Sequence, residues 1–334
     1  MAERIVSLLP SATEIVCALG LRDRLVGVTH ECDFPESVRE LPRVTGSRIP
    51  AGVASGEIDR LVSSQVGGGE SLYSLDAAAL NTLAPDLIIS QTLCDVCAVA
   101  ESEVTAALRG LPSRPRVLYL EPTRLEDVFE SIQQVARAAG VESAARPLVL
   151  SLRQRLARLR PEAPEHGGPV GGATRSGIDV RVGRGDVAAS RGGPPRVVVL
   201  EWLDPLFTCG HWTPDLVAAC GAIEPLAGSG ERSRRIEESD LIAADPDALL
   251  IACCGFDVAR TMADVPAFLA RSGVSGLRCV RQRRVFVVDG SQYFSRPGPR
   301  LVDSAELLCH AVFPGRIDRP ASAGTAVVAA CGRT

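Results

Sequence analysis

Two cysteines at C-x-x-C spacing are the first feature of this sequence that could do chemistry. Cys94 and Cys97 lie in QTLCDVCAV, directly after the apolar run DLIIS. Thiols at this spacing can bind a metal ion, cycle between thiol and disulfide, or line a pocket without reacting. Together with His30 and Cys32 of the turn-rich stretch HECDF, they could supply the four ligands of a zinc or iron site. The spacing alone leaves all three interpretations open.

The elements that must position these side chains follow an alternating pattern. In residues 1–122, the short β-rich runs RIVSLL, RLVGVT, DLIIS and RVLYL alternate with helical patterns. The first helix is expected to begin with Ser11 as its N-cap and Glu14 as the capping-box partner. Alternation of this kind predicts a parallel sheet covered by helices on both faces.

The same pattern divides the chain into segments. Residues 1–122 are predicted to form an α/β lobe, and residues 123–160 one long or broken connecting helix. Residues 161–195 are rich in glycine and proline, which predicts a disordered insertion. Strand–helix alternation restarts in a second α/β lobe at 196–318, and a loose tail is expected at 319–334.

Ligands of open α/β sheets bind at the carboxyl ends of the strands, where loops and helix N-termini converge. Many residues that follow the predicted strands are polar, thiol-bearing or aromatic. The candidates for a ligand-binding cleft between the lobes are Pro10, Ser11, His30, Cys32, Gln91, Cys94, Cys97, Trp202, Phe207, His211, Trp212, Cys253, Tyr293, Phe294 and Arg296. The aromatic rings could stack on a flat ligand, and Arg296 could bind an anionic group. The alternative for each ring or thiol is a place in the core.

Composition and missing motifs exclude several classes of function. A net charge of −4 and a pI near 5.7 argue against nucleic-acid binding, and no apolar run is long enough to span a bilayer. The chain opens with MAERIVSLLP, without a basic segment followed by a long apolar one, so we expect a cytoplasmic monomer whose 11 cysteines are mostly reduced. Phosphate-binding, nucleophile-elbow and zinc-protease motifs are absent from the sequence, which predicts a protein that is not an enzyme.

Four segments in order resemble one protein family. RIVSLLPSATEIVCALGL, PDLIIS, LFTCGHWTPDLVAACG and SQYFSRPGPRLVDSAELLC resemble the vitamin B12 and iron-siderophore substrate-binding proteins of ABC importers, closest to the cobalamin-binding branch. The resemblance covers roughly residues 3–160 and 196–316. It implies two Rossmann-like lobes with parallel sheets, joined by a long rigid helix as in class III periplasmic binding proteins, with the ligand between them.

The resemblance also implies partners. It places Pro10, Ser11, Phe207, Trp212, Tyr293, Phe294 and Arg296 in segments that line the ligand cleft. It further implies docking on a permease through acidic side chains of each lobe, here Glu101 or Glu103 and Glu237 or Glu238.

Two hypotheses of different classes follow. The first is a binding protein for cobalamin or a related corrinoid, with no catalysis and no required cofactor, in which His30 or His211 could coordinate cobalt. Haem and iron-siderophores are alternative ligands. The second is a cytosolic metal- or thiol-dependent enzyme, or a metal-handling protein, on the same scaffold, with zinc or iron at the Cys/His cluster.

Overall fold

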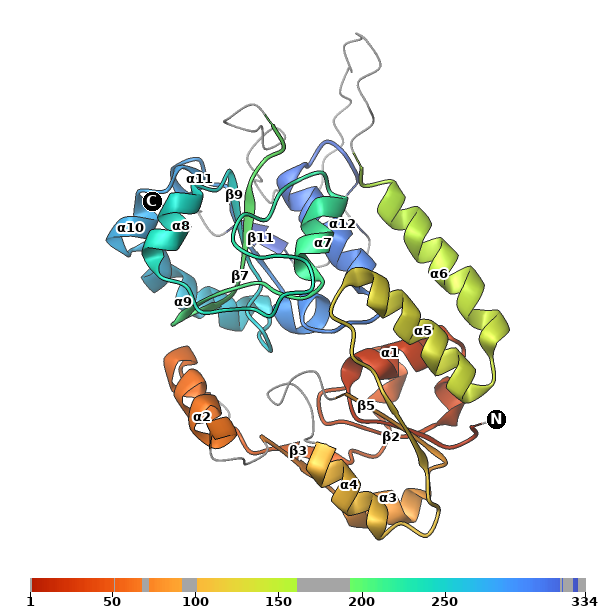
Figure 1. Cartoon of the computed structure of the whole chain (residues 1–334). Coiled ribbons are helices and arrows are strands. Elements are labelled where there is room, and N and C mark those ends of the chain that lie inside the picture. The colour runs from red at the N-terminus through yellow and green to blue at the C-terminus, as the bar shows by residue number, and fades with distance from the viewer. Residues whose placement is uncertain are drawn as a thin grey trace. The chain divides into compact units, whose positions relative to one another are not determined.

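The computed structural model of the chain contains two compact units (Figure 1). The first comprises Met1–Arg153 and Arg296–Arg300, and the second comprises Gln154–Ser295 and Leu301–Thr334. The described residues are 2–50, 52–67, 72–91, 101–160, 193–318, 320 and 327–329. Most of the predicted insertion, residues 161–192, lies outside them.

A four-stranded parallel sheet forms the centre of the first unit, with strand order β2-β1-β5-β6. Its strands are β1 (Ile5–Ser7), β2 (Leu25–Val28), β5 (Leu87–Ser90) and β6 (Arg116–Tyr119). Every residue of β1 and β5 is buried, because helices cover both faces of the sheet.

The helices of the first unit lie on the two faces of this sheet (Figure 1). They are α1 (Pro10–Ala18), α3 (Ala77–Leu83), α4 (Glu101–Arg109) and α5 (Leu125–Ala139). Leu80 and Val104, from α3 and α4, pack in one core cluster with Val6 and Ile88 of the sheet. A two-stranded antiparallel sheet of β3 (Thr45–Ser47) and β4 (Tyr73–Leu75), with helix α2 (Ser55–Gly67) between them, completes the unit.

The start of α1 differs from the sequence prediction. The helix begins at Pro10, whose fixed φ suits the first helical position, and its N-cap is Leu9. Ser11 and Glu14 therefore do not form the predicted capping box. Glu14 is buried instead and contacts arginine side chains described below.

The segment expected to be one long or broken connecting helix is two helices, α5 and α6 (Glu142–Ala157). Gly140 separates them with a φ of 72°, a left-handed conformation that glycine adopts without steric cost. The boundary between the two compact units falls within α6, after Arg153.

A five-stranded sheet with order β11-β10-β9-β7-β8 forms the centre of the second unit. Its strands are β7 (Val197–Leu203), β8 (Leu206–Thr208), β9 (Ala248–Ile251), β10 (Val285–Val288) and β11 (Val327–Ala329). The inner strands β7, β9 and β10 are parallel, and the two edge strands are antiparallel to their neighbours. The predicted α/β class with parallel sheets is confirmed.

Helices again flank this sheet (Figure 1). They are α7 (Thr213–Ala219), α8 (Glu238–Ala244), α9 (Val258–Leu269), α10 (Ser272–Ser275), α11 (Arg278–Arg281) and α12 (Leu301–Val312), and a π-helical turn spans Gly290–Phe294. Leu241 of α8 and Phe268 of α9 pack against Leu249 and Val287 of the sheet in one core cluster. The aliphatic runs VVVL, ALLI and VFVV supply the sheet side of this core.

The tail was expected to be loose, but part of it is a strand. Val327–Ala329 pairs antiparallel with β10, with Val328 opposite Val287. Two β-branched valines suit a strand, and the edge of β10 offers unpaired backbone groups, which the local pattern of the tail does not reveal.

Gly290, directly after β10, provides a test of this packing. A Cβ at this position would lie 2.2 Å from the carbonyl oxygen of Cys253 and 2.6 Å from the carbonyl carbon of Ala252, both rigid backbone atoms. We expect Gly290→Ala to lower the free energy of unfolding by at least about 1–3 kcal/mol, the usual cost of overpacking, visible as a lower thermal midpoint.

Gly193→Ala is the matched control, because a Cβ there has no described atom within 4 Å. Equal midpoints for the Gly290→Ala variant and wild type would contradict the close approach of the two strand ends.

Candidate functional site

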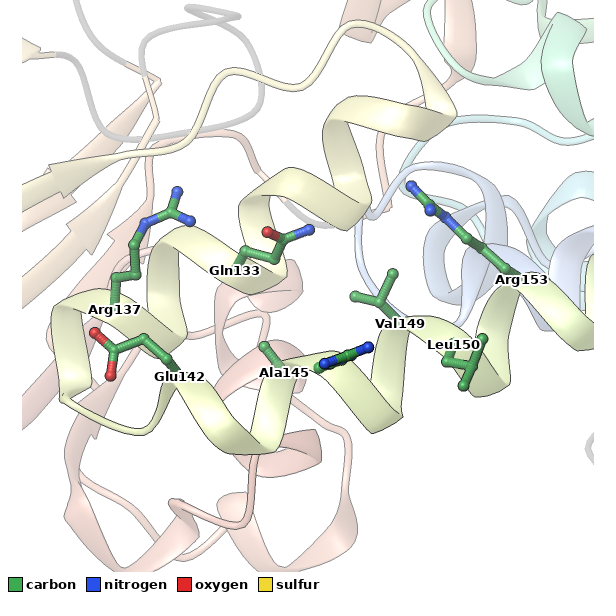
Figure 2. A pocket seen from close by; sticks show the side chains of 8 residues that line it. Gln133, Arg137, Glu142, Ala145, Val149, Leu150 and Arg153 are labelled. Carbon is green, nitrogen blue, oxygen red and sulfur yellow. The ribbon is translucent and has the colours of Figure 1, made fainter.

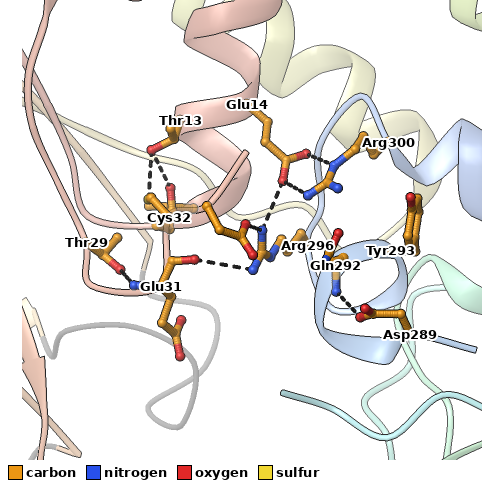
Figure 3. A network of polar contacts seen from close by, with 12 residues as sticks. Thr13, Glu14, Thr29, Glu31, Cys32, Asp289, Gln292, Tyr293, Arg296 and Arg300 are labelled. Carbon is orange, nitrogen blue, oxygen red and sulfur yellow. Dashed lines mark hydrogen bonds and ion pairs between the residues drawn. The ribbon is translucent and has the colours of Figure 1, made fainter. Parts of the chain in front are cut away.

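A buried ion-pair network holds the strand ends of the first unit together (Figure 3). Glu14 of α1 is 3% exposed, and its two carboxylate oxygens accept hydrogen bonds of 2.5 and 3.0 Å from the guanidinium of Arg300. Arg296 reaches the same carboxylate at 3.5 Å and donates a 2.5 Å hydrogen bond to Asp33. The Arg300 guanidinium also lies over the ring of Phe34, 4.1 Å from its centroid.

This network explains why Arg296–Arg300 belongs to the first unit although the neighbouring residues on both sides belong to the second. Burial raises the pKa of Glu14, and the two arginines oppose that rise. Arg296, predicted to bind an anionic ligand group, is only 7% exposed and also donates to the carbonyl oxygen of Glu31. Its guanidinium therefore fixes the loop that follows β2.

Other predicted site residues of the first unit are mostly buried. Ser11, Cys32 and Gln91 are 2%, 1% and 7% exposed, while Pro10 is half-buried. The Cys32 Sγ lies 3.0 Å from the Thr13 hydroxyl oxygen, and burial raises the pKa of this thiol to about 11. At neutral pH it is therefore a protonated core thiol.

Only part of the predicted metal site can be located. Cys94 and Cys97 lie outside the described residues. Of the other two candidates, Cys32 is hydrogen-bonded to Thr13 and His30 is hydrogen-bonded to Thr45. Among the residues that the structure describes, no group of three or more His, Cys, Asp or Glu side chains could hold a metal ion.

His30 belongs to a small polar cluster after β2. Its Nδ1 lies 2.7 Å from the Thr45 hydroxyl, and its ring centroid lies 5.4 Å from that of Tyr73. The Tyr73 hydroxyl donates a 3.4 Å hydrogen bond to Glu31. Burial lowers the pKa of His30; the Glu31 carboxylate opposes this shift and Arg43 adds to it, and the net direction favours a neutral imidazole near pH 7. Sequence reasoning missed Tyr73, which comes at the start of a strand rather than at its end.

In the second unit, four predicted site residues pack into the interior. Trp212, Cys253, Tyr293 and Phe294 are between 1% and 8% exposed. The Trp212 indole N–H donates a 2.9 Å hydrogen bond to the Phe294 carbonyl oxygen, so these two residues fix each other's segments. These four side chains therefore pack inside the second unit rather than on its surface.

Three predicted aromatic or imidazole rings of this unit remain half-exposed: Trp202, Phe207 and His211. The Trp202 ring packs on Phe256 with centroids 4.8 Å apart, and the His211 ring stacks on Trp212 at 5.4 Å and 29°. Phe256 was missed by sequence reasoning, although it lies in the loop after β9, where the strand-end rule could have found it. The strand ends thus display partly exposed flat rings, a surface suited to stacking on a planar ligand. The Arg260 guanidinium lies over the Phe256 ring, 4.3 Å from its centroid.

A half-buried carboxyl, Glu224, lies beside Cys209 in the same unit. Glu224 accepts hydrogen bonds from the backbone N–H groups of Val199 (2.7 Å) and Leu226 (2.9 Å), and the Cys209 thiol lies 3.6 Å from it. Burial raises the pKa of Glu224 to about 7, against an ordinary value of 4.5, although the two backbone donors lower it. The position after Gly221 carries no pattern that predicts this role.

Burial also raises the pKa of several described thiols. It raises the pKa of Cys253 and Cys279 to about 12 and that of Cys209 well above its ordinary value. Nucleophilic and metal-binding cysteines need a thiolate, which such environments disfavour. These thiols are poorly suited to the catalytic role in the alternative hypothesis.

A hollow of about 460 Å³ lies away from the strand ends, between α5 and α6 (Figure 2). It is lined by Gln133, Arg137, Glu142, Ala145, Arg146, Val149, Leu150 and Arg153. Arg137 and Arg153 pair with Glu130 and Glu126, so two of its three cations are neutralised within the same helices. None of the predicted ligand-binding residues lines this hollow.

The family model described as periplasmic binding protein matches residues 5–171 of the chain, which include the sheet of the first unit and the helices α5 and α6. The chain belongs to the periplasmic binding protein family. This membership confirms the family resemblance, and it confirms the prediction of a binding protein rather than an enzyme.

Two relatives cover nearly the whole periplasmic binding protein described here. An uncharacterized ABC transporter substrate-binding lipoprotein of Bacillus subtilis is 24% identical over 93% of this chain and 80% of its own length. A vitamin B12-binding protein of Vibrio cholerae is 23% identical over 92% of this chain and 88% of its own length.

Solved structures share the fold. A periplasmic heme binding protein from Pseudomonas aeruginosa has a TM-score of 0.67 at 21% identity, with both chains covered completely. The periplasmic vitamin B12 binding protein of Vibrio cholerae has a TM-score of 0.59 at 21% identity, covering 93% of this chain and 96% of its own.

These relatives correct one expectation. The cytoplasmic location inferred from the first residues is wrong, because the matching proteins are a lipoprotein and periplasmic binding proteins. The compartment argument for reduced cysteines fails with it. Within the described part of the chain, no helix combines the length and apolar character needed to span a bilayer.

The raised pKa of Glu224 predicts that the free energy of unfolding depends on pH. Between pH 4.5 and about 7 the folded protein keeps a proton on this carboxyl that the unfolded chain has already lost. The free energy of unfolding therefore contains a contribution that is present at pH 4.5 and lost as the pH rises to 7, by up to about 3 kcal/mol. Urea unfolding at pH 5, 6, 7 and 8 measures it.

Glu224→Gln should remove this contribution, so the difference in unfolding free energy between wild type and variant should change with pH across that window. A pH-independent difference would show that Glu224 does not titrate there. Glu121→Gln, an exposed carboxylate of the first unit, is the control.

Proposed function

We propose that this protein binds cobalamin or a related corrinoid as the substrate-binding component of an ABC importer. The observation that carries the proposal is the set of half-exposed rings at the strand ends of the second unit: Trp202, Phe207, His211 and Phe256. Flat rings of this kind stack on a planar macrocycle without needing its charge. The relatives named as vitamin B12-binding proteins support the corrinoid over other flat ligands.

Haem is the second candidate, and specific observations favour it as well. Both His30 and His211 have lowered pKa values, caused mainly by burial, so each imidazole is neutral near pH 7 and could coordinate a metal centre. A heme-binding relative shares the fold. An iron-siderophore offers a less extended flat surface to the same rings.

Titration with cyanocobalamin, dicyanocobinamide and haemin, followed by tryptophan fluorescence and by calorimetry, separates these ligands. We expect a corrinoid to bind, and Trp202→Ala or Phe207→Ala to weaken its binding about 5- to 20-fold, since each substitution removes a stacking ring.

Ile223→Ala is the matched control. This apolar side chain is 46% exposed, and Ile223 forms a backbone bridge with Arg196, just before the amino end of β7. It therefore lies at the end of the strand opposite to the proposed stacking rings. No binding of any of the three ligands would contradict the proposed function. Binding of haemin alone would show that haem, and not a corrinoid, is the ligand.

We further propose that a permease docks on acidic side chains of this protein. Glu237 is exposed and Glu238 is half-buried at the start of α8, where Glu238 lies 3.7 Å from Arg271. The side chains of Glu101 and Glu103, on α4, lie outside the described residues. The exposed carboxylate of Glu237 is therefore the better candidate in the second unit.

Glu237→Lys tests the docking proposal. In vesicles containing the cognate permease and ATPase, we expect the variant to stimulate ATP hydrolysis about tenfold less than wild type, because like charges would meet at the contact. Its affinity for the ligand should be unchanged. Asp318→Lys, another exposed acid of the second unit, is the control, and equal stimulation by both variants and wild type would refute the role of Glu237.

A further inference from the structure

An arginine-bearing loop lies directly against the strand-end surface of the second unit. A Cβ on Gly210 would lie 2.3 Å from the backbone nitrogen of Ser233 and 2.8 Å from the carbonyl carbon of Arg232. The His211 N–H donates a 2.6 Å hydrogen bond to the carbonyl oxygen of Glu231, and the Gly230 N–H donates to the His211 oxygen at 2.9 Å. The loop and the imidazole are therefore held together by backbone contacts.

This loop carries three arginines within four residues: Arg232, Arg234 and Arg235. Arg234 donates a hydrogen bond to the carbonyl oxygen of Leu226. Arg232 and Arg235 are exposed, and neither forms an ion pair with any residue that the structure describes. The acid within the loop is Glu231, whose carboxylate accepts a 3.2 Å hydrogen bond from the backbone N–H of Gly228.

His211 is the residue that links the loop to the aromatic rings. Its ring stacks on Trp212, and its Nε2 is buried without a hydrogen-bond partner in the described part of the chain. Burial is the main cause of its lowered pKa, and the positive charge of Arg232 lowers it further. Arg235 forms an isolated antiparallel bridge with Phe207, so the two exposed arginines lie on the segment that runs beside Phe207 and His211.

We propose that Arg232 and Arg235 bind an anionic oxygen group on the edge of a planar ligand whose face lies against His211 and Phe207. This inference rests on the proposed function and adds to it the charge of the ligand. Guanidinium groups form strong charge-assisted hydrogen bonds with phosphate and carboxylate oxygens. In a corrinoid the group is the phosphodiester of the nucleotide side chain, and in haem it is a propionate.

Two ligand pairs test the proposal, each consisting of an anionic compound and a counterpart without the anion. Cobalamin is compared with cobinamide, which lacks the phosphodiester, and haemin with its dimethyl ester. We expect wild type to bind the anionic member of one pair about tenfold or more tightly than its counterpart, with the difference reduced at high salt. The pair that shows the difference identifies the anion as phosphate or carboxylate.

The double variant Arg232→Gln/Arg235→Gln should lose about tenfold or more in affinity for the anionic member and change its affinity for the counterpart less than twofold. Arg281→Gln is the control, since Arg281 is exposed on α11, before the amino end of β10. Thermal midpoints of all variants verify folding.

Each possible result either supports or overturns the role of the two arginines. Equal wild-type affinities within both pairs, or a double variant that binds all ligands like wild type, would overturn the role of the arginines and leave the proposed function intact. A double variant that loses both members of a pair equally would also overturn it. Failure of wild type to bind any of the four compounds would refute the proposed function and this inference with it.

Discussion

The buried pairing of Glu14 with two arginines is the interaction on which the first unit depends. A carboxylate at 3% exposure is costly to bury, and Arg300 and Arg296 supply the opposite charges within hydrogen-bonding reach. Removing one partner of such a pair generally costs about 3–5 kcal/mol, because the other charge stays buried and uncompensated. The same contacts hold the loop after β2 and attach Arg296–Arg300, which is distant in sequence, to the first unit.

Burial also separates the predicted site residues into those that pack in the core and those that stay partly exposed. The sequence placed thiols, rings and histidines at strand ends, and most of them are there. Cys32 and Cys253 are core thiols, however, and Trp212 is an anchor that bonds to the Phe294 carbonyl oxygen. Among the predicted site residues of the second unit, Trp202, Phe207 and His211 stay partly exposed. The surface is therefore better suited to stacking on a ligand than to thiol or metal chemistry.

The fold was largely predictable, because its signals are local. Aliphatic runs such as VFVV alternate with helical patterns, and only a parallel sheet covered on both faces buries such runs completely. The left-handed Gly140 between α5 and α6 is likewise a local feature. The strand at Val327–Ala329 was not predictable, since its stability comes from pairing with β10, which is about 40 residues away.

The sequence by itself determined the fold class and the family, because strand–helix alternation and the resemblance of four segments can be recognised from local sequence. Tertiary structure alone decided what each side chain does. Glu14 fits a capping box by spacing, yet it pairs with arginines more than 280 positions away. Glu224 has no motif, yet burial brings its pKa to about 7. Burial and long-range charge pairing depend on which segments meet in space, and no local pattern contains that information.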